Sequence, residues 1–262
     1  MFHRVLSDLI NKKMLSSADD RILVICGGSY DASVLRDAGI KYAVISNLDA
    51  RFQEGYAPFD WAHEDAESLS FPDGSFDWVF VHAGLHHCVS PHRALLEMCR
   101  VTRKGIVVIE ARDSFLMRIA VALGLAVDYE LDAVAISDFK WGGIRNSTIP
   151  NYIYRWTERE VIKTIECFMP EKIHRFLFYY GIRFPTERLT MSSYSKRALA
   201  RILGGLAKAA QQMFPKQCNE FGFVVLKTTE LKPWIREVDG SFEMRRDYKM
   251  SFNPKKYKRW VP

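Results

Sequence analysis

The stretch Arg21-Ile-Leu-Val-Ile-Cys-Gly-Gly-Ser-Tyr-Asp31 decides how the rest of the chain folds. Its apolar run from Ile22 to Ile25 is typical of a strand that is buried on both faces, as in a parallel sheet. Gly27 and Gly28 follow at once, and they allow a sharp turn and a close approach of the backbone to a ligand. A helix is expected to begin near the end of the stretch and to stop at Gly39. This order predicts the opening of a nucleotide-binding βαβ unit.

Strands and helices are expected to alternate beyond this unit. Strands are predicted at residues 41–46, 60–65, 78–81, 106–109, 174–184 and 221–227. Helices are predicted at 2–15, from Ser90 to a stop at 103–105, at 114–127, from a capping box at Thr157 to Phe168, and over most of 192–214, with an irregular connection at 128–156. The pattern predicts an α/β fold, a Rossmann-like, doubly wound, seven-stranded, mostly parallel sheet with helices on both faces.

The length of 262 residues and the absence of a clear linker favour one domain over residues 1–230. Within it, we expect an N-terminal helix inside 1–18, and the acceptor side and last strands inside 114–230. The remaining residues, 231–262, hold much of the net charge of +6 and are predicted to form a basic C-terminal tail. Such a tail can bind phosphates or anionic lipid, or it can simply be a solvated surface segment.

Several classes of protein are disfavoured by composition. No apolar run is long enough to span a bilayer, and the first residues lack the layout of a signal peptide, so a cytoplasmic location is expected. The five cysteines show no paired spacing, which favours reduced thiols over a disulfide framework or a zinc site, and no metal is expected. The oligomeric state is left open.

Asp49 lies about twenty residues beyond the glycine turn, where βαβ units place a carboxylate that binds ribose hydroxyls. An ionised carboxylate accepts two hydrogen bonds and therefore suits a vicinal diol. The alternative is that Asp49 caps a helix that follows it, and one residue can do both.

The most specific motif is Asp65-Ala-Glu-Ser-Leu-Ser-Phe-Pro-Asp-Gly-Ser-Phe-Asp77. Together with Leu85-His-His87 and the pattern of residues 93–101, it resembles the class I S-adenosylmethionine-dependent methyltransferases of the type 11-like group. The resemblance is strong over 21–113 and weak elsewhere.

This resemblance implies S-adenosyl-L-methionine as the cofactor and S-adenosyl-L-homocysteine as the product. It implies that the glycine turn lies against the methionine and ribose of the cofactor and that Asp49 binds the ribose hydroxyls. It also implies that one group of residues contacts the adenine and that another forms the floor of the site. The turn residues are Cys26, Gly27, Gly28 and Ser29, the adenine residues are Asp65 and Ala66, and the floor residues are His82 and Ala83.

The glycine turn departs from the family pattern, because Cys26 and Tyr30 stand where glycines are usual and Val24 stands where an acid is usual. A nicotinamide dinucleotide is the rival ligand. Its G-x-G-x-x-G fingerprint fails here, since Tyr30 and Ser33 occupy the second and third glycine positions counted from Gly28.

His86 and His87 follow the fourth predicted strand, near the expected methyl group. Either is a candidate catalytic base if the acceptor must lose a proton, because neutral imidazole titrates near working pH. The alternative is that one histidine caps the next helix and the other packs beneath the site.

The acceptor site is expected in the irregular connection, where aromatic walls mix with hydrogen-bond donors and suit a polar acceptor. The candidates are Trp141, Arg145, Asn146, Tyr152 and Arg155. The alternative is that the aromatic rings pack on the sheet and the arginines face water.

The leading hypothesis is a methyltransferase that acts on a small molecule or on a glycan or lipid precursor. Two alternatives are kept: an RNA methyltransferase that uses the basic tail, and a non-catalytic protein that binds S-adenosylmethionine. Nucleic acid is a possible partner without a recognisable RNA-binding module to support it.

Overall fold

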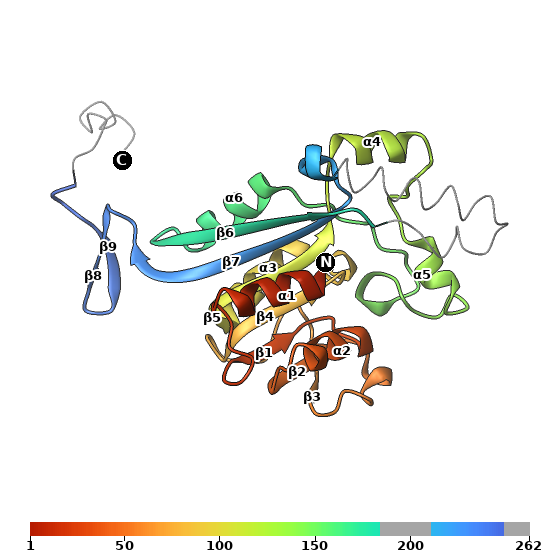
Figure 1. The fold of residues 1–262 in the computed structure, drawn as a ribbon, viewed down its shortest axis with the longest axis horizontal. Helices are drawn as coiled ribbons and strands as arrows, with labels where there is room; N and C mark the ends of the chain where they lie inside the picture. The colour runs from red at the N-terminus through yellow and green to blue at the C-terminus, as the bar shows by residue number, and fades with distance from the viewer. Residues whose placement is uncertain (184–210, 249–262) are drawn as a thin grey trace, which may run out of the picture.

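Seven strands form one sheet at the centre of the computed structural model, which describes residues 1–183 and 211–248 (Figure 1). The sheet strands are β1 (Arg21–Val24), β2 (Tyr42–Asn47), β3 (Asp60–His63), β4 (Phe76–His82), β5 (Thr102–Ala111), β6 (Lys172–Gly181) and β7 (Glu220–Leu231). A separate hairpin consists of β8 (Ile235–Val238) and β9 (Ser241–Met244). The predicted seven-stranded, doubly wound sheet is confirmed.

The strands lie in the order β3-β2-β1-β4-β5-β7-β6. Pairing is parallel from β3 to β5, whereas β7 runs antiparallel to both β5 and β6. The carboxyl ends of the parallel strands therefore meet at one edge of the sheet, which is where open α/β sheets bind ligands.

Helices cover both faces of the sheet, as expected. They are α1 (Phe2–Asn11), α2 (Ser29–Asp37), α3 (Pro91–Val101), α4 (Phe115–Ala122), α5 (Leu131–Ala135) and α6 (Glu158–Phe168), with short 3₁₀ turns η1 (Ala50–Phe52), η2 (Leu85–His87), η3 (Ile144–Asn146) and η4 (Pro215–Gln217). No helix in the described ranges combines the length and apolar character needed to cross a membrane.

Alternate residues of β1 separate the two layers of the core. Ile22 and Val24 pack with the buried faces of α1 and α2, while Leu23 points to the opposite layer, with α3 and α6. Because successive strand residues face opposite sides, a strand buried on both faces reads as an unbroken apolar run. The N-terminal helix predicted at residues 2–15 is α1, and its residues Phe2 and Leu9 are buried in this core.

The expected stop of the third helix at residues 103–105 is wrong, because β5 already begins at Thr102. Gly105 is a strand residue. A Cβ atom there would lie 2.5 Å from the carbonyl oxygen of Val225, so glycine permits β7 to approach at this point.

The helix expected at 114–127 is shorter, and the connection at 128–156 is more regular than predicted. The helix α4 ends at Ala122, and Gly124 beyond it has a φ of +69°. The connection contains α5 and η3. Such short, stabilised turns carry little periodic signal in the sequence.

Part of the predicted basic tail is folded as the β8–β9 hairpin. Because β7 is antiparallel to the parallel strands, it ends at their amino edge, and the hairpin leaves the sheet there (Figure 1). The predicted helix at 192–214 lies almost entirely outside the described residues, as do residues 249–262.

Candidate functional site

A cavity of about 320 Å³ opens at the carboxyl ends of β1, β2 and β4. Its size is that of a small-molecule site. It is lined by Cys26, Asn47, Leu48, Asp49, Glu64, Asp65, Ala66, Glu67, Ala83, Gly84, His87, Cys88, Trp141, Gly142, Gly143, Arg145 and Asn146. Residues predicted for the cofactor, for the acceptor and for catalysis thus meet in one place.

The turn after β1 is compressed against its neighbours. A Cβ at Gly27 would lie 2.9 Å from the side chains of Val24 and Ile45, so only glycine fits without displacement. The left-handed residue of the turn is Cys26, with a φ of +51°, a conformation that glycine adopts most easily. Gly27, Gly28 and Ser29 line a second hollow beside the cavity, and Asn47 borders both.

Asp49 caps η1 by accepting a hydrogen bond from the Arg51 backbone N–H, so the capping role is confirmed. Its carboxylate also accepts hydrogen bonds from Nε and Nη2 of Arg51, at 2.7 and 2.5 Å. The hydrogen bonds from Arg51 hold the pKa of Asp49 below its ordinary value, against the effect of burial. The ribose-binding role of Asp49 stays a prediction.

Asn47, which the sequence interpretation missed, is the last residue of β2 and joins the turn to the Asp49 loop. Its Nδ2 donates to the Gly27 carbonyl at 2.9 Å, and its Oδ1 accepts from the Asp49 N–H at 2.9 Å. The signal that could have found it is its place at a strand end, since polar residues there face the ligand edge of the sheet.

The start of the second motif forms another wall of the cavity. Asp65 accepts a hydrogen bond from the Glu67 backbone N–H at 2.9 Å, and its other oxygen lies 2.8 Å from Nη2 of Arg145. Glu67 is buried and accepts from the backbone N–H groups of Val89 and Ser90. The motif is therefore tied to the loop after β4.

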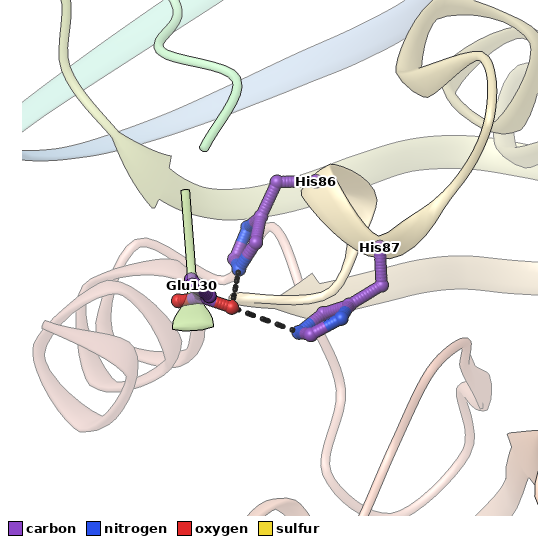
Figure 2. A group of neighbouring side chains, drawn as sticks. All are labelled: His86, His87 and Glu130. Carbon is purple, nitrogen blue, oxygen red and sulfur yellow. Dashed lines mark ion pairs between the residues drawn. The ribbon is translucent and has the colours of Figure 1, made fainter. Parts of the chain in front are cut away.

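His86 is held between the carboxylates of Glu110 and Glu130, and Figure 2 shows the contact with Glu130. Its Nδ1 lies 2.6 Å from Oε2 of the buried Glu110, and its Nε2 lies 3.5 Å from Oε2 of Glu130. Burial opposes the charge on the ring, but Glu110 first and Glu130 second outweigh it and raise the pKa of His86 to about 10. His86 is thus an imidazolium at neutral pH, which does not suit a general base.

His87 is the histidine that lines the cavity. Its Nε2 lies 3.4 Å from Oε2 of Glu130 (Figure 2). Burial first and the neighbouring His86 charge second lower the pKa of His87 below its ordinary value. His87 is therefore neutral at neutral pH and able to accept a proton.

The facing ligand atoms of His86, His87 and Glu130 lie within 4.8 Å of one another, a spacing that a divalent cation could also bridge. A cation would have to displace the proton that His86 holds with a pKa of about 10. The expected absence of a metal therefore stays a prediction.

Glu130, the carboxylate shared by the two histidines, was also missed by the sequence interpretation. It is positioned by Asn151, whose Nδ2 donates to Glu130 Oε2 and whose carbonyl accepts from the Glu130 N–H, both at 3.1 Å. His86 first, and Asn151 and His87 among the weaker causes, lower the pKa of Glu130 to about 2. No sequence pattern marks this residue, because it lies in the irregular connection and meets His86 only in the folded chain.

The predicted acceptor residues separate into two groups. Trp141, Arg145 and Asn146 line the cavity. Tyr152 is half exposed and packs edge-on against Tyr129, and Arg155 pairs with Asp128 at 2.6 Å.

His82, predicted for the cavity floor, instead packs its ring on Phe2 and Tyr30, at centroid distances of 5.8 and 5.1 Å. Ala83, predicted with it, does line the cavity.

Residues 24–109 match a family model described as a methyltransferase domain. The region holds the glycine turn, the Asp65–Asp77 motif and the histidine pair, and the sheet order agrees with the fold that the sequence predicted. Over these residues the chain is similar to the class I S-adenosylmethionine-dependent methyltransferases, which are enzymes with S-adenosylmethionine as cofactor.

Curated relatives match part of the chain. A ubiquinone/menaquinone biosynthesis C-methyltransferase UbiE from Roseobacter denitrificans is 29% identical over 115 residues, covering 39% of this chain and 46% of the relative. The UbiE of Xanthomonas campestris is 34% identical over 99 residues, covering 33% of this chain and 39% of the relative. The matches thus span less than half the length of these relatives.

Solved structures resemble the chain over most of its length. YcgJ from Bacillus subtilis has a TM-score of 0.53 and 14% identity, covering 87% of this chain and 99% of that one. Magnesium protoporphyrin IX methyltransferase from Synechocystis, with bound S-adenosylhomocysteine, has a TM-score of 0.51 and 11% identity, covering 87% of this chain and 82% of that one. At these identities the likeness concerns the fold.

Proposed function

We propose that this chain transfers the methyl group of S-adenosylmethionine to a small molecule or to a glycan or lipid precursor. The observation that carries this proposal is the shared cavity, where Asp49, Asp65 and Ala66 stand with His87 at the ligand edge of the sheet. A donor bound on the first three residues and an acceptor beside His87 would lie within one enclosure.

The cavity residues fit the cofactor chemically. Carboxylates of Asp49 and Asp65 are acceptors for ribose hydroxyls and for an adenine amine, and the buried side chain of Ala66 offers an apolar contact for a ring. When bound, S-adenosylmethionine supplies a methyl group on a positively charged sulfur. The task of the protein is then to align the donor with its acceptor, which can supply about 7–11 kcal/mol where the geometry is good.

The two histidines have different proposed roles in catalysis. His87, neutral and facing the cavity, is the proposed base for an acceptor hydroxyl. His86, charged and buried, positions Glu130 and so orients His87. Glu110 keeps His86 in place from the sheet.

The proposal also concerns the identity of the acceptor. The UbiE relatives are named as C-methyltransferases of ubiquinone and menaquinone biosynthesis, so quinone precursors are the first acceptors to test. The RNA alternative gains no support from residues 231–248, because the β8–β9 hairpin leaves the sheet at the edge opposite the cavity. The cytoplasmic location stays a prediction.

Titration calorimetry with S-adenosylmethionine and S-adenosylhomocysteine tests the proposal. Micromolar affinity for both, followed by methyl transfer to a quinone precursor or another small molecule detected by mass spectrometry, is the expected result. Absence of binding at millimolar ligand would contradict the enzyme proposal. Binding without transfer to any acceptor, RNA included, would favour the non-catalytic alternative.

A further inference from the structure

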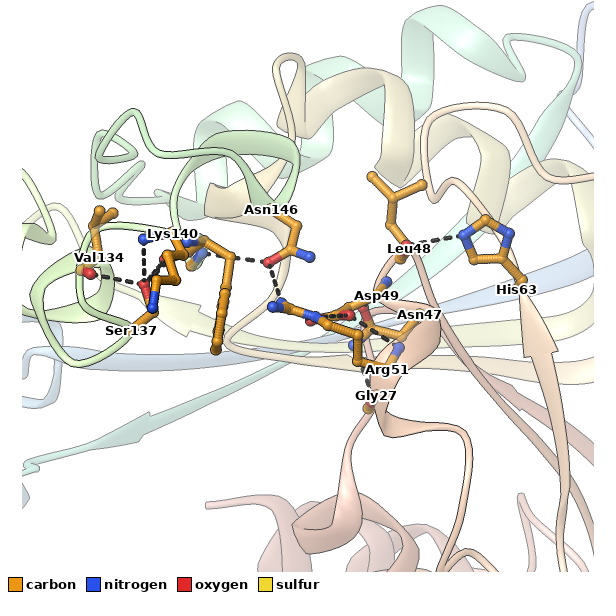
Figure 3. A network of polar contacts seen from close by, with 12 residues as sticks. Gly27, Asn47, Leu48, Asp49, Arg51, His63, Val134, Ser137, Lys140 and Asn146 are labelled. Carbon is orange, nitrogen blue, oxygen red and sulfur yellow. Dashed lines mark hydrogen bonds and ion pairs between the residues drawn. The ribbon is translucent and has the colours of Figure 1, made fainter.

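Arg51 lies between a cofactor-binding candidate and an aromatic ring. Its guanidinium pairs with both oxygens of Asp49, and its Cζ lies 3.7 Å from the ring centroid of Trp141. Figure 3 shows the same side chain reaching Asn146, whose Oδ1 is 3.5 Å from Nη2 of Arg51. A planar cation is therefore stacked on Trp141 and hydrogen-bonded to the carboxylate expected to hold a ribose.

The second cofactor carboxylate is engaged from the same segment. Arg145 lies 2.8 Å from Asp65 through Nη2 and 3.6 Å from Glu67 through Nη1. Trp141, Arg145 and Asn146 were predicted to bind the acceptor, but their partners are the carboxylates expected to bind the cofactor, or Arg51 beside one of them. By position, this segment therefore belongs to the cofactor half of the cavity.

Backbone contacts define where Trp141 stands. Its N–H donates to Oγ of Ser137 at 3.0 Å, and its carbonyl accepts from the same hydroxyl at 2.5 Å. Gly143 follows closely, where a Cβ would lie 1.8 Å from the Ile149 carbonyl oxygen, so the turn requires glycine. The indole of Trp141 is therefore attached to a turn that hydrogen bonds hold in place, and a stacking surface needs such a rigid support.

We propose that Trp141 stacks on the adenosine of the bound cofactor and that Arg51 competes with the adenosine for this place on the indole. The inference rests on the proposed function and reassigns Trp141 from the acceptor to the cofactor. Guanidinium and adenine are both planar groups that stack on indole faces, so one can replace the other on the same ring. On binding, Arg51 leaves Asp49, and the carboxylate becomes available to the ribose.

Calorimetry with S-adenosylhomocysteine and with adenosine alone tests the stacking. Trp141→Ala should weaken both affinities at least about fivefold, and Trp141→Phe should restore most of the loss, because stacking of a base on an aromatic ring is sequence-tolerant. The matched control is Trp234→Ala. Trp234 is partly exposed beneath the cation of Lys232, but it precedes the hairpin at the opposite edge of the sheet.

If Arg51 competes with the cofactor, its replacement should strengthen cofactor binding, whereas replacement of Trp141 should weaken it. Arg51→Gln should tighten S-adenosylhomocysteine binding by about three- to fivefold, since a partly exposed ion pair no longer competes for Asp49. Arg236→Gln is the control, because Arg236 forms an exposed pair with Glu243 on the hairpin.

The outcomes separate this inference from the proposed function. If the wild-type chain binds no S-adenosylhomocysteine, the proposed function fails. If the wild type binds but Trp141→Ala retains its affinity for adenosine and raises only the KM of the acceptor, the stacking inference is overturned and Trp141 belongs to the acceptor. Unchanged or weakened binding in Arg51→Gln would overturn the competition by Arg51.

Discussion

His86 Nδ1 lies 2.6 Å from Oε2 of Glu110, and both side chains are buried. Glu110 belongs to β5, and its other oxygen accepts the Leu85 N–H at 2.7 Å, so one carboxylate organises the whole turn after β4. This contact decides the roles of the two neighbouring histidines, because it keeps His86 charged and leaves His87 neutral.

Replacing His86 with glutamine should remove a pH-dependent part of the stability. The folded pKa of about 10 lies above the ordinary value of 6.5, so protonation of His86 stabilises the fold fully below pH 6.5. This contribution is lost as the pH rises through 10. The difference in free energy of unfolding between wild type and His86→Gln should therefore shrink from pH 6.5 to pH 10 in urea denaturation. A constant difference would contradict the charged state.

His87→Ala should lower kcat about a hundredfold or more if His87 is the base, while the affinity for S-adenosylhomocysteine stays the same. Because the pKa of His87 lies below 6.5, wild-type kcat should be level above that pH and fall only on the acid side. His92→Ala is the control, since His92 pairs with Glu160 and does not line the cavity. Full activity of His87→Ala would show that His87 is not the general base.

Asp49→Ala should weaken S-adenosylhomocysteine binding by more than about tenfold, because a buried ribose diol would lose its acceptors. Calorimetry measures the effect. Asp247→Ala, which removes an exposed carboxylate paired with Arg245, should leave the affinity unchanged. If Asp49→Ala binds as tightly as wild type, Asp49 is only the cap of η1, and Asn47 becomes the better candidate for the ribose.

Gly27→Ala should destabilise the fold by about 1–3 kcal/mol, because the new Cβ meets buried side chains of Val24 and Ile45 at 2.9 Å. Gly28→Ala is the matched comparison. Its Cβ would meet nothing nearer than 4.0 Å, so its cost should be well under that of Gly27→Ala in thermal or urea unfolding. Equal costs would show that helix capping, not crowding, governs this turn.

Short-range patterns predicted the central strands well. The apolar runs of β1, β4 and β5 are buried on both faces of the sheet, and this burial produces a continuous signal in neighbouring residues. Helix starts were also readable where a side chain caps its own backbone, as Ser90 and Thr157 do. The end of α3 was predicted wrongly because Gly105 does not stop a helix. It is a glycine because the backbone of Val225, a residue distant in sequence, packs closely against it.

The site was predictable only in part. Asp65, Ala66 and the histidine pair follow strands within a recognisable motif, and of these Asp65, Ala66 and His87 line the cavity. Glu130 carries no such signal, since its importance comes from its contacts with Asn151 and with His86. Trp141 and Arg145 were noticed as site residues, but their partners could not be inferred from their own surroundings in the chain.

By itself, the sequence determined the order of strands and helices, the glycine turn and the resemblance to a methyltransferase family, because each depends on residues within one or two elements. Only the tertiary structure decided which histidine is charged and which end of the cavity Trp141 covers. Those properties depend on Glu110, Glu130 and Arg51 reaching partners on other elements or loops, and the electrostatic environment of a side chain exists only once such groups are brought together.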